Sequence, residues 1–61
     1  MNKRDLVKLL SKNGFEKTEL GKGSHEVWRH PDGRVTTVPK PSRSDYAPGT
    51  LNKILKDAGL K

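Results

Sequence analysis

A tight turn between two short segments of β-type residues constrains the fold of this chain more than any other feature. The Pro-Asp-Gly sequence at 31–33 is a strong hairpin signal, because glycine accepts the positive φ that such turns require. The flanking segments, 24–30 and 34–38, contain β-branched and aromatic residues that favour strands. A third such segment, 15–20, is joined to 24–30 by a short glycine-containing stretch at 21–23. The sequence therefore predicts a three-stranded antiparallel meander.

One helix is expected before this meander and one after it. Asn2 can cap the first helix, and Gly14 ends it. Pro48 suits the first turn of the second helix, and Gly59 supplies its left-handed cap, so both helices end in glycine followed by an apolar residue. The apolar faces consist of Leu6, Leu9 and Leu10 in the first helix and of Leu51, Ile54, Leu55 and Ala58 in the second. Because these faces need a partner, we expect both helices to cover one face of the sheet in an α+β fold.

The size and composition of the chain limit what it can contain. A chain of 61 residues is expected to form a single domain, 1–61, with a small core and no room for a buried cofactor. The absence of cysteine excludes disulfides and thiolate metal sites, so packing alone must stabilise the fold. Residues 39–47 contain two prolines and are expected to form an ordered connection. No apolar run reaches the length of a membrane span and the first residues lack a signal-peptide core, so we expect a cytoplasmic protein.

Positive charge is spread along the whole chain. Thirteen lysine and arginine residues against seven aspartate and glutamate residues give a net charge of +6. A distributed positive field suits RNA, DNA or an acidic protein as the partner. Charge alone does not choose among these partners.

The side to which Trp28 points decides where the polar residues of segment 24–30 lie. Side chains alternate along a strand, so His25, Val27 and Arg29 share one face and Trp28 lies on the other. If Trp28 packs beneath the helices, His25 and Arg29 project together from the open face, where they would suit a phosphate group. The opposite orientation would bury His25 and expose Trp28 as a stacking platform for a base. We favour the buried Trp28, because a large aromatic side chain supplies much of the buried area of a small core.

Several short motifs follow one another in a specific order along nearly the whole chain. They are Leu-Val-Lys-Leu-Leu at 6–10, Asn13-Gly14-Phe15, Gly23-Ser24-His25, Trp28 with Arg29-His30-Pro31-Asp32-Gly33-Arg34, Val38-Pro39, Gly49-Thr50-Leu51, Ile54-Leu55 and Ala58-Gly59-Leu60. Together they resemble the HicA toxins of bacterial and phage toxin–antitoxin modules, also described as YcfA-like messenger RNA interferases. The resemblance implies an α-β-β-β-α fold like that of double-stranded-RNA-binding domains. It also implies metal-independent cleavage of RNA that depends on the histidine matching His25, and neutralisation by a HicB antitoxin.

One departure from the family pattern affects the expected chemistry. Many HicA toxins carry a histidine shortly after the third strand, in a Val-Pro-x-His arrangement, whereas this chain has Val38-Pro39-Lys40-Pro41. The side chain of Pro41 cannot transfer a proton or form a hydrogen bond. If the second histidine assists catalysis in relatives, this protein either recruits another group, such as Lys40 or Arg43, or is slower.

His25 is the candidate catalytic residue. Cleavage of RNA without a metal requires a base for the ribose 2′-hydroxyl, charge stabilisation at the phosphate and an acid for the leaving 5′-oxygen. Histidine suits the proton transfers, because imidazole accepts and donates protons near neutral pH. Arg29 and Lys22 are the candidates for binding the phosphate, with Ser24 orienting the imidazole or the substrate. His30 is five residues from His25, so a regular strand places it on the opposite face, where we expect a structural role.

The sequence therefore favours a metal-independent ribonuclease toxin, with RNA and a HicB-like antitoxin as partners. Two other classes of function are weighed against this reading. The first is a non-catalytic module, similar to double-stranded-RNA-binding domains, that recognises RNA by shape and phosphate contacts. The second is a protein-interaction partner whose basic surface serves only an acidic antitoxin. A metal site is not expected, because the spacing of the histidines and nearby carboxylates matches no zinc pattern.

Overall fold

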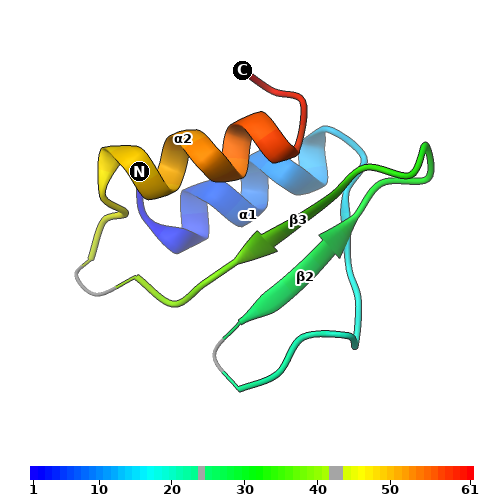
Figure 1. The fold of residues 1–61 in the computed structure, drawn as a ribbon, viewed down its shortest axis with the longest axis horizontal. Coiled ribbons are helices and arrows are strands. Elements are labelled where there is room, and N and C mark those ends of the chain that lie inside the picture. Colours follow the sequence, from blue (N-terminus) through cyan, green and yellow to red (C-terminus); the bar gives the residue numbers. More distant parts are fainter. Residues whose placement is uncertain (24, 42–43) are drawn as a thin grey trace.

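The elements follow one another in the predicted order, helix, three strands, helix. The computed structural model describes residues 1–23, 25–41 and 44–61, so the predicted roles of Ser24 and Arg43 fall outside the described residues. The elements are α1 (Lys3–Lys12), β1 (Glu16–Lys17), β2 (Glu26–Arg29), β3 (Val35–Val38) and α2 (Pro48–Asp57) (Figure 1). The predicted α+β fold with the order α-β-β-β-α is confirmed. Neither helix in the described ranges is long and apolar enough to cross a membrane.

Both helices begin and end at the residues that the sequence indicated. The Asn2 side chain caps α1 by accepting a hydrogen bond from the backbone N–H of Asp5, at 2.8 Å. Pro48 occupies the first turn of α2. At the other ends, Gly14 and Gly59 adopt φ values of +91° and +71°, which glycine accepts without strain. The next N–H donates back into the last turn in each case, in the bonds Phe15 N to Leu10 O (2.9 Å) and Leu60 N to Leu55 O (2.8 Å).

The sheet is an antiparallel meander with the order β1-β2-β3, as predicted. Its strands are shorter than the predicted segments, and the largest difference concerns 15–20, of which only Glu16–Lys17 pairs as a strand. The strand ends early because the hydroxyl of Thr18 donates to the carbonyl of Val27 and accepts the N–H of Leu20. A side chain that bonds the backbone in this way competes with the ladder. Leu20 is consequently 69% exposed.

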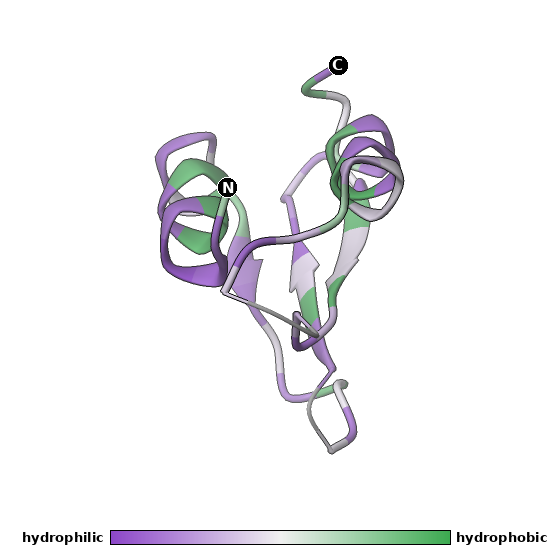
Figure 2. Ribbon diagram, turned by 90° about the vertical axis from the view of Figure 1, so that its left-hand side faces the viewer, coloured by the Kyte–Doolittle hydropathy of each residue, from purple (hydrophilic) through white to green (hydrophobic). Residues whose placement is uncertain are grey.

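One face of the sheet is covered by both helices, and the other is open. Trp28 pairs with Thr36 across the ladder and both are buried, whereas their chain neighbours Arg29 and Thr37 are exposed. Figure 2 shows the helices on the same side of the sheet, with hydrophobic stretches turned toward the space between them. The core consists of Leu6, Leu10, Phe15, Trp28, Val38, Tyr46, Ile54 and Ala58. The prediction that Trp28 points inward is confirmed.

The connection between β3 and α2 is tied to the rest of the molecule through Tyr46. Its hydroxyl donates to the carbonyl of Pro39 at 2.7 Å, and its backbone N–H donates to the carbonyl of Met1 at 3.0 Å. Tyr46 is 6% exposed and belongs to the core, which the sequence did not indicate. These contacts support the expected ordered connection over the described part of 39–47.

Candidate functional site

His25 lies at the start of β2, with its backbone fixed and its side chain exposed. Its N–H donates to the carbonyl of Lys22 at 3.1 Å, just before the strand begins. The chain also passes close by at Gly21, where a β-carbon would collide with the carbonyl oxygen of His25. The main chain therefore positions this residue without burying the imidazole, which is left accessible for chemistry.

On the opposite face of β2, Glu26 contacts both Trp28 and α1. The indole N–H of Trp28 donates to one carboxylate oxygen of Glu26 at 3.1 Å, and Lys3 of α1 forms an ion pair with the other oxygen. The hydrogen bond from Lys3 is the main reason that the pKa of Glu26 lies below its usual range, although partial burial opposes it. These contacts join α1 to β2 beneath the open face.

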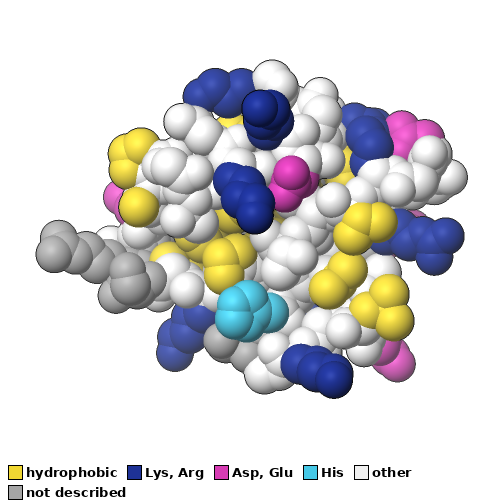
Figure 3. Space-filling model, viewed as in Figure 1, with side chains coloured by type: hydrophobic (Ala, Val, Ile, Leu, Met, Phe, Trp, Pro, Cys, Tyr) yellow, Lys and Arg dark blue, Asp and Glu magenta, His cyan; other side chains and the backbone are white. Residues whose placement is uncertain are grey.

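A shallow hollow of about 230 Å³ lies beside His25 and brings it together with α2. The strand register explains the contact, because Glu26 pairs with Val38 and so His25 lies across from Pro39, next to the helix. The other lining residues are Thr37 from β3 and Thr50, Lys53, Ile54 and Asp57 from α2. Figure 3 shows a histidine exposed in this view, bordered by hydrophobic side chains and with basic side chains around it. The sequence did not indicate that α2 would supply charged neighbours to His25.

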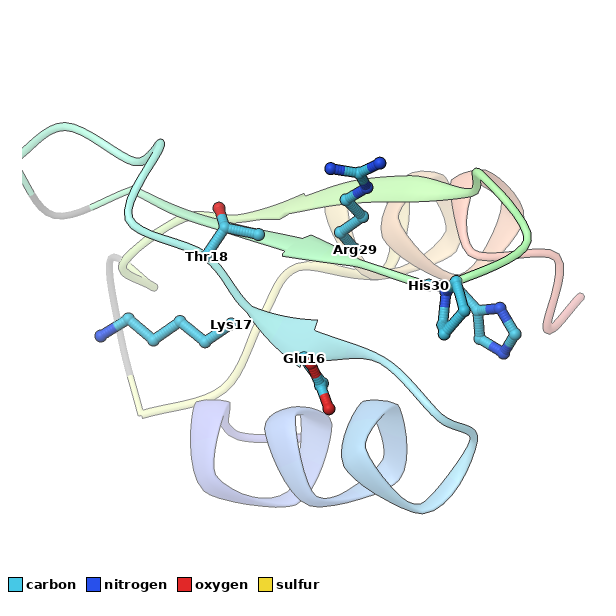
Figure 4. Close-up of a pocket in the computed structure, with 6 residues that line it drawn as sticks. Glu16, Lys17, Thr18, Arg29 and His30 are labelled. Atoms are coloured by element: carbon cyan, nitrogen blue, oxygen red, sulfur yellow. The ribbon is translucent and has the colours of Figure 1, made fainter.

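Arg29 lines a different hollow, at the other end of β2. This hollow has a volume of about 320 Å³, and its lining consists of Glu16, Lys17, Thr18, Arg29, His30 and Pro31. Figure 4 shows Arg29 and Thr18 extending to the same side of the sheet, with His30 farther along toward the turn. Four residues of strand separate Cα atoms by about 13 Å. His25 and Arg29 thus share the open face, as predicted, but they line separate hollows.

The remaining candidates lie outside the hollow of His25. Lys22 is exposed, and its carbonyl accepts the N–H of His25. Lys40, considered as a substitute for the missing second histidine, lines a neighbouring hollow with Pro41 and Tyr46. Within 1–23, 25–41 and 44–61, no three histidine, cysteine, aspartate or glutamate residues are grouped as metal ligands would be.

His30 is bound into the structure by contacts on several sides. Its ring packs edge-on against Phe15, with centroids 5.2 Å apart, and its Nδ1 accepts the backbone N–H of Asp32 at 3.1 Å. At Gly14 a β-carbon would approach the imidazole Nε2 to 2.8 Å, so the end of α1 packs closely on this ring. These contacts agree with the structural role expected for His30.

Comparison with known families identifies the chain. The family model described as HicA toxin of bacterial toxin-antitoxin matches residues 4–60, which is nearly all of the chain. A search of curated proteins found no match. The match extends over α1, the three strands and α2, and so includes the hollow beside His25 and the hollow beside Arg29. The protein belongs to the HicA family of toxins from bacterial toxin–antitoxin systems.

Proposed function

We propose that this toxin is a metal-independent endoribonuclease in which His25 acts as the general acid or base. The observation that carries the proposal is the position of His25 within a HicA toxin: its imidazole is exposed at the start of β2, beside a hollow that contains a lysine. The net charge of +6 favours a polyanionic substrate. Histidine transfers protons near neutral pH, which hydrolysis of RNA without a metal requires.

The proposed reaction uses the ribose itself as the nucleophile. His25 takes the proton of the 2′-hydroxyl, the 2′-oxygen bonds to phosphorus, and the bond from phosphorus to the 5′-oxygen breaks. The leaving 5′-oxygen takes a proton from water or from a second acid. The products are a 2′,3′-cyclic phosphate and a 5′-hydroxyl, and no metal-bound water is involved.

RNA beyond the reacting phosphate is proposed to lie along the open face of the sheet. Arg29 at one end of β2 and Lys22 before the other end would contact backbone phosphates, because cations position nucleic acids through such contacts. For Ser24 we retain the role of orienting the imidazole or the substrate. The whole chain is proposed to act as one toxin domain, neutralised by a HicB-like antitoxin that covers this face.

The test is cleavage of RNA by the purified toxin in the presence of a chelator. We expect the wild type to remain active, to leave 2′,3′-cyclic phosphate ends, and to spare a substrate with 2′-deoxyribose at the scissile position. His25→Ala should abolish cleavage and growth inhibition but retain RNA binding. Lys8→Ala, which removes an exposed charge from α1, is the matched control and should behave like the wild type. RNA binding without cleavage by the wild type would instead indicate a non-catalytic binding module.

A further inference from the structure

We propose that Lys53 of α2 is a catalytic residue that stabilises the charge on the scissile phosphate. This inference rests on the proposed function of His25. It assigns stabilisation of the reacting phosphate to a residue that the sequence did not indicate. Arg29 and Lys22 would then position the RNA backbone rather than the reacting phosphate.

The hollow beside His25 has the groups that such a phosphate needs. Lys53 supplies an ammonium group, and the hydroxyls of Thr37 and Thr50 can donate hydrogen bonds to phosphate oxygens. The hollow is shallow and lies on the surface, which suits one phosphodiester group of a long chain better than an enclosed small molecule. A cation there would face the charge that develops as the 2′-oxygen attacks.

The helix backbone that carries Lys53 is also held at a fixed place relative to His25. The hydroxyl of Thr36 in β3 donates to the carbonyl of Ile54 at 3.1 Å, directly after Lys53 in the helix. One turn later, the guanidinium of Arg34 donates to the carbonyl of Ala58 at 2.7 Å. These bonds fix α2 on β3, and the ladder fixes β3 on β2. Preorganisation of this kind makes a charged group effective in catalysis.

Three other basic side chains, Lys3, Arg34 and Lys61, are already engaged. Lys3 is paired with Glu26 on the covered face, and Arg34 binds both Asp32 and Ala58. Lys61 donates to Asn52. Among the described residues, the lysines and arginines in ion pairs are Lys3 and Arg34, and none of these pairs involves Lys53. Its ammonium group is therefore available to an incoming phosphate.

Asp57 also lines the hollow, and its negative charge opposes the binding of a phosphate there. It follows Lys53 by one helical turn, and its carboxylate repels an incoming anion. If the hollow takes a phosphate, removal of the Asp57 charge strengthens RNA binding, whereas removal of the Lys53 charge weakens catalysis. The two substitutions therefore have opposite expected signs.

The experiment compares single-turnover cleavage of one RNA oligonucleotide at saturating protein by the wild type, Lys53→Ala, Lys53→Arg and Lys56→Ala. Lys56 is the matched control, since it is an exposed lysine of α2 outside the hollow. We expect Lys53→Ala to slow cleavage by roughly 10- to 100-fold, Lys53→Arg to recover part of the rate, and Lys56→Ala to stay near the wild type. Asp57→Asn should bind the oligonucleotide more tightly. Circular dichroism and thermal melting should be unchanged in all four variants.

The outcomes separate this inference from the proposed function. Wild-type cleavage that His25→Ala abolishes but Lys53→Ala leaves at the rate of Lys56→Ala would overturn only the role of Lys53. A weaker binding of RNA by Asp57→Asn would also contradict a phosphate in this hollow. If the wild type does not cleave RNA, the proposed function fails, and the inference fails with it.

Discussion

One histidine lies directly before β2 and another directly after it, and their surroundings differ. Among the described residues, the hydrogen bonds of His25 involve its backbone alone, and its imidazole is exposed next to α2. His30 is half-buried, packs on Phe15 and accepts a hydrogen bond within the turn that follows. The same side chain is therefore available for proton transfer at one end and committed to the fold at the other. The contrast shows that contacts, rather than residue type, distinguish a candidate catalytic histidine from a structural one.

The largest effect is expected from the covered face of the same strand. Trp28→Ala removes the largest side chain of the core and should destabilise the protein by roughly 3 to 5 kcal/mol, which a small domain barely tolerates. Thermal melting and circular dichroism measure the loss. A Trp28→Ala protein that stays folded but loses affinity for RNA would show that this face contacts the substrate, contrary to the structure.

Much of this arrangement could be predicted from local signals in the sequence. The Asn2 cap, the glycine ends of both helices and the turn at 31–33 depend on a few neighbouring residues, and alternation then placed Trp28 opposite His25. The early end of β1 could not be predicted in this way, because it depends on a bond from the Thr18 hydroxyl to the distant Val27.

The hollow beside His25 was equally inaccessible to sequence reasoning. It forms because α2 packs along β3, which brings Lys53 and Asp57 to a residue far away in the chain. The signal that could have found them is the strand register, since pairing of Glu26 with Val38 carries His25 toward the helix. Helical spacing alone shows only that Lys53 and Asp57 share a face.

Acidic pH is expected to have a smaller effect on stability, through the carboxylate of Glu26 that binds Trp28. The folded state lowers the pKa of Glu26, so its ion pair stabilises the fold above the pKa of the unfolded chain and loses that contribution as the pH falls through the folded pKa. Because Lys3 is partly solvated, we expect about 1 kcal/mol. Glu26→Gln should lower stability at neutral pH and flatten its dependence between neutral and acidic pH, as chemical denaturation would measure. An unchanged pH profile in this variant would rule out the contribution.

The smallest effects are expected from the open face of the sheet, where single charged side chains are proposed to contact RNA. RNA affinity should fall steeply with salt, and the slope of log K against log salt should shrink by about one in Arg29→Ala or Lys22→Ala. Lys8→Ala, on α1, should leave the slope unchanged. Fluorescence anisotropy over a salt series measures all four proteins. A wild-type affinity that stays flat between low and physiological salt would remove RNA as the natural ligand.

The contrast between the two histidines is tested most directly by measuring the melting temperature and the RNA cleavage rate of His25→Ala and His30→Ala together. For His25→Ala we expect the melting temperature of the wild type and a cleavage rate lower by roughly 100- to 10,000-fold. For His30→Ala we expect a loss of about 1 to 2 kcal/mol in stability, with cleavage by the folded protein near the wild-type rate. Undiminished cleavage by a folded His25→Ala protein, or a stable His30→Ala protein that no longer cleaves RNA, would contradict the account.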